Sequence, residues 1–184
     1  MQVLIDEGRI AERVAELAAT LRRQYQGRDL VCVGVLKGCF IFMADLLRQL
    51  GLPVTVDFLG VASYGGSTEP AKLRVTKDVD VDLAGRDVLV IEDICDTGVS
   101  LGAVVRLLGT QNPASIGTCV LLDKPSRRKV DFNPDYVGFS IPDAFVVGYG
   151  LDYAERHRHL PHIATLPGDA GEQDRDTPNT EETR

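Results

Sequence analysis

Apolar residues recur at helical spacing near the start of the chain. They are Ile10, Val14, Leu17 and Leu21. This spacing is typical of an amphipathic helix that buries one face and leaves its arginines in water. Asp6 precedes the pattern and can cap a helix, and Gly27 follows it. We therefore predict a helix that begins after Asp6 and ends before Gly27.

Two continuous apolar runs have the length of β-strands. They span residues 30–36 and 87–93, and such runs are typical of strands buried on both faces of a parallel sheet. A third apolar strand is predicted at 116–122, and helices are predicted at 40–50 and 98–109. Shorter or alternating patterns predict strands at 54–58, 72–78, 136–140 and 145–149.

The order strand, helix, strand indicates parallel strands that are joined by right-handed crossovers. With 184 residues, of which 44% are hydrophobic, the chain has the size and composition of one ordinary folded domain. We therefore predict a single α/β domain with a central, mostly parallel sheet and helices on both faces.

Residues 167–184 differ in composition from the rest. Only Ala170 is apolar there, and six acidic residues accompany two basic ones. Such a stretch cannot bury enough apolar surface to offset its conformational entropy. We predict a folded domain over residues 1–166 and a disordered acidic tail over residues 167–184.

Charge and hydropathy argue against nucleic acids and membranes as partners. The formal net charge is −7, from 20 basic and 27 acidic residues. A protein that is held on nucleic acid by neutralising phosphates is expected to be basic. No apolar stretch approaches the roughly 20 residues that span a bilayer, and the N-terminus lacks the basic and apolar regions of a signal peptide. We expect a cytoplasmic protein without nucleic-acid or membrane partners.

The cysteines support the same location. They are Cys32, Cys39, Cys95 and Cys119, and no C-x-x-C pair occurs. Three of them lie in apolar runs, where a reduced thiol in the core is the simpler interpretation. We therefore expect no disulfide bonds.

The segment 88–101 carries the clearest chemical signal. Its strand ends in Glu92 and Asp93, and a turn then leads into a helix. In parallel α/β sheets, ligands bind at the carboxyl ends of the strands. Successive N–H groups at the helix start, with the hydroxyls of Thr97 and Ser100, form a cradle for phosphate.

Three carboxylates stand beside this cradle, because Asp96 follows Glu92 and Asp93 closely. They would repel a bare phosphate. The ligand should therefore also offer hydroxyls or bring a divalent cation, as a ribose phosphate with Mg²⁺ does. The simpler alternative is that the two adjacent acids only cap the following helix or pair with arginines.

Two further segments could complete such a site. Lys37 and Gly38 follow the first buried strand, so a cation and an unhindered N–H lie at the same sheet edge and could hold a pyrophosphate. Phe145 offers a ring on which a flat base can stack, and the backbone of Val146 could read the base edge. The alternatives are a solvated lysine and a phenylalanine of the core.

The segment 88–101 resembles the phosphoribosyl-diphosphate signature of the type I phosphoribosyltransferases. Other stretches resemble the hypoxanthine-guanine branch of that family: LKGC at 36–39, SYGGST at 63–68, LLDKPSRR at 121–128 and the long segment 134–160. The resemblance covers essentially all of residues 1–166. Cys39 stands where many members have a second glycine.

The resemblance implies the type I phosphoribosyltransferase fold, with a small hood formed by the termini of the domain and a flexible lid loop. It implies a purine salvage enzyme that transfers the phosphoribosyl group of phosphoribosyl diphosphate to hypoxanthine or guanine, with Mg²⁺ as cofactor. It also implies a homo-oligomer, either a dimer or a tetramer. The alternatives are a nucleotide-sensing, RNA-binding regulator on the same fold and a phosphoribosyltransferase for another base.

The resemblance also assigns roles to residues at matching positions. The phosphoribosyl group and its 5′-phosphate are assigned to Glu92, Asp93, Ile94, Cys95, Asp96, Thr97, Gly98 and Ser100. Asp96 is the candidate catalytic base for the purine N7 proton. Pyrophosphate is assigned to Lys37, Gly38 and Arg158, with a cis peptide bond before Lys37. The purine is assigned to Lys124, as donor to its O6 oxygen, and to Phe145, Val146 and Asp152. The metal is assigned to Glu92, Asp93 and Asp152, and the lid to Ser63 and Tyr64.

Simpler interpretations exist for several of these residues. Asp152 could be a surface acid, Arg158 part of a solvated helix, and residues 63–64 the tip of an ordinary hairpin. The histidines lack the cysteine or acid that would complete a zinc site; they are His157, His159 and His162. A calcium loop at 78–82 is disfavoured because Leu83 replaces its glycine, and the valines at 79 and 81 favour a strand there.

Overall fold

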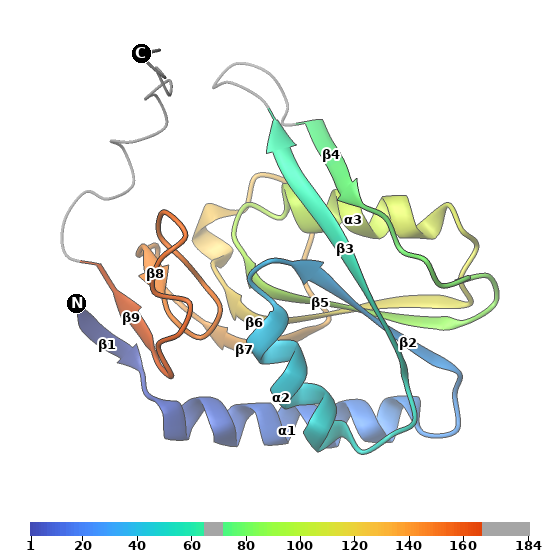
Figure 1. The fold of residues 1–184 in the computed structure, drawn as a ribbon, viewed down its shortest axis with the longest axis horizontal. Coiled ribbons are helices and arrows are strands. Elements are labelled where there is room, and N and C mark those ends of the chain that lie inside the picture. Colours follow the sequence, from blue (N-terminus) through green and yellow to red (C-terminus); the bar gives the residue numbers. More distant parts are fainter. Residues whose placement is uncertain (65–71, 167–184) are drawn as a thin grey trace, which may run out of the picture.

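A computed structural model describes residues 1–64 and 72–166 of the chain. Within these ranges the chain forms two β-sheets, three α-helices and a short 3₁₀ helix (Figure 1). The elements are, in chain order, β1 (Gln2–Ile5), α1 (Glu7–Tyr25), β2 (Leu30–Leu36), α2 (Phe40–Leu50), β3 (Thr55–Tyr64), β4 (Lys72–Lys77), β5 (Asp87–Cys95), α3 (Val99–Gly109), β6 (Ser115–Asp123), η1 (Pro125–Arg127), β7 (Tyr136–Ser140), β8 (Val146–Val147) and β9 (Ile163–Thr165).

The larger sheet has the strand order β4-β3-β2-β5-β6-β7. Strands β3, β2, β5, β6 and β7 run parallel, and β4 pairs antiparallel with β3. The prediction of a central, mostly parallel sheet is therefore confirmed. Strands β2 and β5 lie in the middle of this sheet, which explains their continuous apolar sequences.

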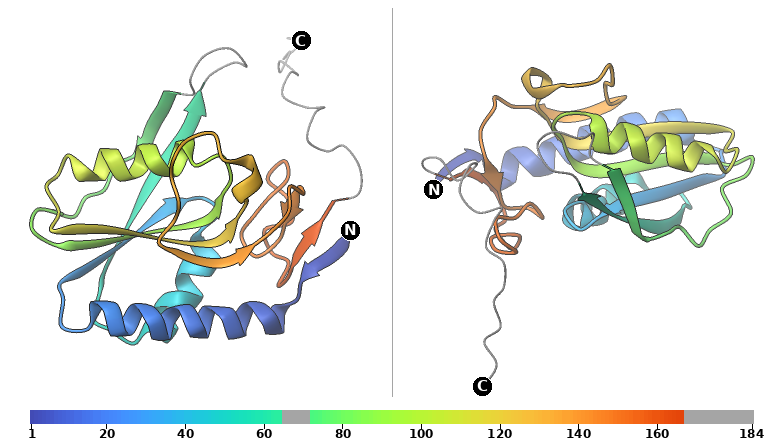
Figure 2. Two further views of the ribbon diagram at one scale, coloured as in Figure 1. Left: turned by 180° about the vertical axis from the view of Figure 1, so that it is seen from behind. Right: turned by 90° about the horizontal axis from the view of Figure 1, so that it is seen from above.

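Helices cover both faces of this sheet. Helices α1 and α2 lie on one face and α3 on the other (Figures 1 and 2). Successive residues of β5 alternate between the two layers, because side chains alternate along a strand. Leu89 and Ile91 pack in the core with α1 and α2, whereas Val88 and Val90 pack in the core with α3.

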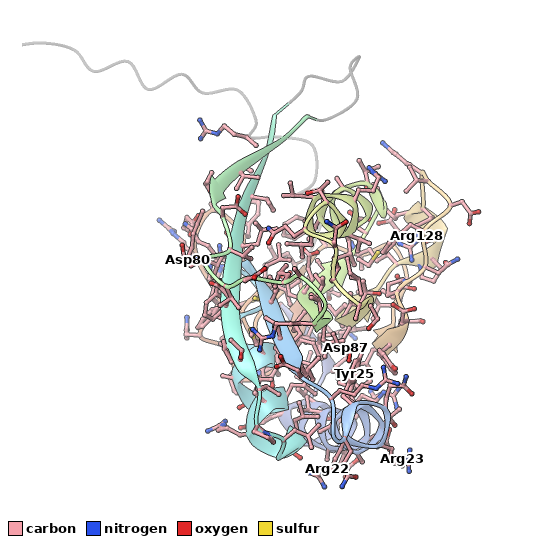
Figure 3. The ribbon with its side chains drawn as sticks, turned by 90° about the vertical axis from the view of Figure 1, so that its right-hand side faces the viewer. Arg22, Arg23, Tyr25, Asp80, Asp87 and Arg128 are labelled. Atoms are coloured by element: carbon pink, nitrogen blue, oxygen red, sulfur yellow. The ribbon has the colours of Figure 1, made fainter. Side chains whose placement is uncertain are left out.

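Helix α1 begins and ends where the apolar pattern predicts. Asp6 accepts a hydrogen bond from the N–H of Arg9 at 2.9 Å and caps the helix. Arg22 and Arg23 lie on the outer surface (Figure 3). Arg22 Nε also donates to the carbonyl of Leu50 at 2.7 Å, which joins the end of α1 to the end of α2.

A second, antiparallel sheet of order β1-β9-β8 joins the two ends of the domain. It lies beyond the carboxyl ends of the central strands and is the expected hood (Figure 1). Strands β1 and β9 were not predicted from the sequence. They have only four and three residues, too few for an apolar pattern to be recognised.

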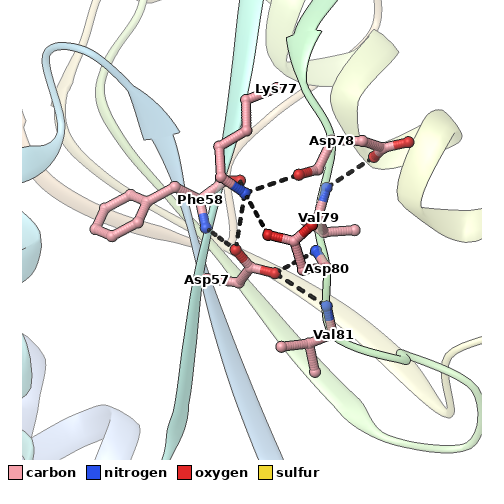
Figure 4. A network of polar contacts seen from close by, with 7 residues as sticks. All are labelled: Asp57, Phe58, Lys77, Asp78, Val79, Asp80 and Val81. Carbon is pink, nitrogen blue, oxygen red and sulfur yellow. Dashed lines mark hydrogen bonds and ion pairs between the residues drawn. The ribbon is translucent and has the colours of Figure 1, made fainter.

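The prediction of a strand around residues 79 and 81 is wrong. Strand β4 ends at Lys77, and the chain then forms a loop around the buried carboxylate of Asp57 (Figure 4). This carboxylate accepts N–H groups of Asp80 and Val81 at 2.6 and 3.1 Å. It also accepts Lys77 Nζ at 3.2 Å. The loop N–H groups thus bond to a side chain of β3 rather than to another strand.

Other strand boundaries also differ from the predictions. Strand β3 continues to Tyr64 and β5 to Cys95, whereas β8 is only Val146–Val147. The chain leaves β8 at Gly148, which has φ +100° and starts a turn.

The rest of the predicted lid and the predicted tail lie outside the described residues. All four cysteines are buried and unpaired. No helix in the described ranges has the length and hydropathy needed to cross a bilayer.

Candidate active site

The loop after β2 lies between the end of β5 and a turn of the hood. A Cβ atom built on Gly38 would lie 1.8 Å from Asp93 Oδ2, so the loop backbone rests directly on that carboxylate. A Cβ atom built on Gly150 would lie 2.2 Å from the Gly38 carbonyl oxygen. Two glycines therefore let three segments, distant in sequence, meet at the carboxyl edge of the sheet. The peptide bond between Leu36 and Lys37 is cis, as the resemblance implied.

The predicted phosphate cradle surrounds a cavity of about 220 Å³. The residues that line it are Glu92, Ile94, Cys95, Asp96, Thr97, Gly98, Ser100 and Leu101. Gly98 has φ +79° immediately before α3, a backbone conformation that favours glycine. Of the residues assigned to the phosphoribosyl group, all except Asp93 line this cavity, and the helix start directs its N–H groups toward it.

The acid pair at the end of β5 has strongly perturbed carboxyl groups. Burial and the neighbouring Asp93 raise the pKa of Glu92 well above its usual value. Burial raises the pKa of Asp93 from 3.8 to about 6, although N–H groups of Asp93 and Ile94 oppose the rise. Glu92 Oε2 is buried without a hydrogen-bond partner. An oxygen in this state fits a ligand hydroxyl or a divalent cation, and neither acid caps α3.

Asp152 does not join this pair in a preformed metal site. Its Oδ1 instead lies 2.8 Å from Arg158 Nη2. Among the described residues, no three acidic, histidine or cysteine side chains converge as metal ligands. A divalent cation bound here would therefore need ligand oxygens in addition to those of Glu92 and Asp93, which suits a cation that arrives with a phosphorylated substrate.

The two cations assigned to pyrophosphate are brought close together. Lys37 Nζ lies 2.9 Å from Glu155 Oε1, and Arg158 Nη2 lies 3.3 Å from Glu155 Oε2. Arg158 also donates to the Gly150 carbonyl at 2.8 Å. Arg158 is thus part of the hood turn and not of a solvated helix. Glu155 was not predicted from the sequence, because its position depends on the turn and on no recognisable motif.

The predicted purine contacts come from two places, the start of β8 and the chain just after β6. The ring of Phe145 is 39% exposed, so it is available for stacking and is not a core residue. It meets Tyr153 edge-on, with 5.4 Å between ring centroids. Val146 is buried in β8. The Lys124 side chain is also buried, and its Nζ lies 3.9 Å from Asp143 Oδ1.

Two arginines that the sequence analysis left without a role hold the Asp96 loop. Arg127 Nε lies 3.0 Å from Asp96 Oδ1. Arg128 donates to the Asp96 carbonyl at 2.6 Å and pairs with Asp123 at 2.5 Å. Both arginines belong to the SRR end of the quoted LLDKPSRR motif. This motif could have indicated from the sequence that they lie in the site. Ser63 and Tyr64, assigned to the lid, end β3, and the loop that follows is not described.

The structure combines a mostly parallel sheet, an acid pair and a loop suited to phosphate after a central strand, and a hood. This is the architecture of a phosphoribosyltransferase. Residues 4–154 match the model of the phosphoribosyl transferase domain. The chain belongs to this family.

Individual relatives cover nearly the whole domain. A hypoxanthine phosphoribosyltransferase of Salmonella typhimurium is 49% identical over 169 residues, 90% of this chain and 95% of that protein. The hypoxanthine-guanine phosphoribosyltransferase of Bacillus subtilis is 49% identical over 166 residues, 90% of this chain and 92% of that protein. The crystal structure of the Staphylococcus aureus hypoxanthine phosphoribosyltransferase has a TM-score of 0.87 at 46% identity, covering 90% of this chain and 91% of that one.

Proposed function

We propose that the protein is a purine salvage enzyme that transfers the 5-phosphoribosyl group from phosphoribosyl diphosphate to hypoxanthine or guanine. The products are inosine or guanosine 5′-monophosphate and pyrophosphate. The observation that carries the proposal is the cavity at residues 92–101, beside an acid pair with an unpartnered oxygen and the Lys37–Gly38 loop. The names of the relatives support the same reaction.

The phosphate cradle positions the sugar. The N–H groups of Thr97, Gly98 and Ser100 bind the 5′-phosphate, and the helix dipole of α3 favours its negative charge. The carboxylates of Glu92 and Asp93 then face the ribose hydroxyls. Glu92 Oε2 gains the hydrogen-bond partner that it lacks in the free protein.

The leaving group binds between the loop after β2 and the turn that carries Arg158. Lys37, the Gly38 N–H and Arg158 bind the pyrophosphate, so they stabilise the negative charge that grows on it as the C1′–O bond breaks. Glu92 and Asp93 would hold Mg²⁺, with Asp152 as a further assigned residue, and the ion would neutralise part of the pyrophosphate charge. The lid of Ser63 and Tyr64 excludes water from the cationic sugar.

The base binds on the side of β8 and η1. The purine stacks on Phe145 and its edge meets the backbone of Val146. Lys124 Nζ donates to an acceptor at position 6, which hypoxanthine and guanine offer and adenine does not. Asp96 accepts the N7 proton, and Arg127 orients its carboxylate. We also propose that the enzyme acts as a cytoplasmic dimer or tetramer, which sedimentation would test.

A substrate panel tests the reaction. The purified protein is assayed with phosphoribosyl diphosphate, with and without Mg²⁺, and with hypoxanthine, guanine, xanthine, adenine or uracil as the base. We expect turnover of 6-oxopurines only, and none without Mg²⁺. Turnover of adenine or uracil would contradict the assigned base contacts. No turnover with any base, together with tight binding of nucleotide and RNA, would favour the RNA-binding regulator instead.

Asp96→Asn tests the assigned proton acceptor. We expect kcat for hypoxanthine to fall about 10²-fold or more, because the amide cannot accept the N7 proton. Asp82→Asn is the matched control, since Asp82 is exposed in the loop before β5 at the opposite edge of the sheet. Equal activity of the two variants would exclude Asp96 as the base.

A further inference from the structure

Glu155 holds both of the cations to which pyrophosphate is assigned. Its Oε1 lies 2.9 Å from Lys37 Nζ and its Oε2 lies 3.3 Å from Arg158 Nη2. The two carboxylate oxygens thus contact one lysine and one arginine from segments more than a hundred residues apart. These two cations lower the pKa of Glu155, which favours the charged form.

The backbone of Glu155 is held in a tight turn. Glu155 has φ +60°, a conformation that non-glycine residues rarely adopt. Its N–H donates to Asp152 Oδ2 at 2.8 Å, and an antiparallel bridge joins Tyr153 to Arg156 around it. The turn therefore places the Cα of Glu155 within reach of both cations.

The pair of contacts has little value for stability. The side chains of Lys37 and Glu155 are 67% and 66% exposed. Exposed ion pairs contribute little to the free energy of folding, because water and salt screen them. Arg158 already has a carboxylate partner in Asp152 and a carbonyl partner in Gly150. Glu155 adds negative charge where the reaction needs an anion to bind.

We propose that Glu155 is an internal competitor of pyrophosphate: its carboxylate takes the place of a pyrophosphate oxygen between Lys37 and Arg158 and must be displaced when the substrate binds. Carboxylates and phosphates use the same hydrogen-bond donors of lysine and arginine. The competition weakens the binding of phosphoribosyl diphosphate and of pyrophosphate. It also speeds product release, because Glu155 closes on the cations as pyrophosphate leaves. This inference rests on the proposed function for the assignment of Lys37 and Arg158.

Calorimetric titration with magnesium pyrophosphate tests this competition directly. We compare the wild-type protein with Glu155→Gln, which keeps the shape of the side chain and loses its charge. We expect the variant to bind pyrophosphate roughly three- to tenfold more tightly, because two screened ion pairs no longer have to be broken. Glu155→Ala should change the affinity in the same direction.

Glu16→Gln is the matched control. Glu16 is also an exposed glutamate, 65% exposed and paired with Arg13 on α1, and the variant removes one negative charge away from the site. Its affinity for pyrophosphate should equal that of the wild-type protein. In a Lys37→Met background, the gain from Glu155→Gln should shrink, since one of the two cations is already absent.

The direction in which the affinity for pyrophosphate changes distinguishes a competing role of Glu155 from a structural one. A glutamate that only supports the turn would give weaker pyrophosphate binding when it is replaced, and equal or weaker binding by Glu155→Gln overturns the proposal. The titration needs no purine and no turnover. If the protein fails to transfer phosphoribose to any base, the proposed function fails. The competition is still decided by the affinities of these variants for pyrophosphate.

Discussion

The carboxyls of Glu92 and Asp93 are held at the end of β5 in surroundings that oppose their ionisation. Burial raises the pKa of both, and Gly38 presses its backbone against the Asp93 carboxylate. A carboxylate that is costly to ionise in the free protein gains the most interaction free energy when a cation or a hydroxyl group binds to it. The buried acid pair therefore lowers the stability of the free protein and raises its affinity for the ligand.

Asp93→Asn should flatten the dependence of stability on pH in metal-free protein. The pKa of Asp93 rises from 3.8 to about 6 on folding. Between these values the carboxyl has lost its proton in the unfolded chain and keeps it in the folded chain, so the contribution of Asp93 to stability falls as the pH rises and levels off above pH 6. One such shift amounts to at most about 3 kcal/mol. Urea unfolding in EDTA at pH 4.5, 6 and 7.5 measures it, and an unchanged slope would contradict the assignment.

Gly38→Ala should disable substrate binding with little effect elsewhere. The new Cβ would lie 1.8 Å from Asp93 Oδ2, so the loop has to move away from the acid pair. We expect KM for phosphoribosyl diphosphate to rise about tenfold or more. Gly27→Ala is the control, because Gly27 has φ +78° but no atom within 4 Å of its Cβ position. It should lose about 1 kcal/mol of stability and keep its kinetic constants.

At the scale of elements, the last residue of the 3₁₀ helix η1, Arg127, and the residue after it, Arg128, hold the predicted phosphate cradle in place. Arg128 links the Asp96 carbonyl to Asp123 at the end of β6, and both side chains of this ion pair are largely buried. The loop after β6 thus fixes the loop after β5, together with backbone hydrogen bonds from the Lys124 N–H to the Cys95 carbonyl at 2.9 Å and from the Lys129 N–H to the Thr97 carbonyl at 3.0 Å.

Arg128→Met should separate stability from substrate binding. Removal of the guanidinium leaves the Asp123 charge buried without its partner, which costs about 3 to 5 kcal/mol. The double variant with Asp123→Asn should recover most of this loss in urea unfolding. KM for phosphoribosyl diphosphate should stay raised in both variants, since neither holds the Asp96 carbonyl. Recovery of KM in the double variant would show that the arginine acts only through stability.

The helices and the buried strands could be predicted because their apolar patterns are long and continuous. The strand around residues 79 and 81 could not be excluded, because its N–H groups bond to Asp57, a side chain more than twenty residues earlier. In the site, the predicted phosphate cradle is one contiguous segment, and seven of its eight assigned residues line one cavity. Glu155 and Arg127 were missed because their contacts arise from turns that join separate segments.

At the scale of the whole molecule, the central sheet brings the site together. The carboxyl ends of β2, β5 and β6 lead into the segments to which we assign the pyrophosphate, the 5′-phosphate and the purine O6. The hood, formed by the first and last strands of the described domain, adds Phe145 and the turn with Arg158. The strand ends and the hood together therefore bring the residues assigned to the base and to the leaving group to the predicted phosphate cradle.

A crystal structure of the protein with inosine 5′-monophosphate tests this arrangement most directly. We expect the 5′-phosphate within about 3 Å of the N–H groups of residues 97–100. We expect the ribose hydroxyls at Glu92 and Asp93, and the purine stacked on Phe145 with O6 at Lys124 Nζ. A nucleotide whose phosphate binds outside the cavity of residues 92–101, or whose base lies away from Phe145, would contradict the proposed transfer site.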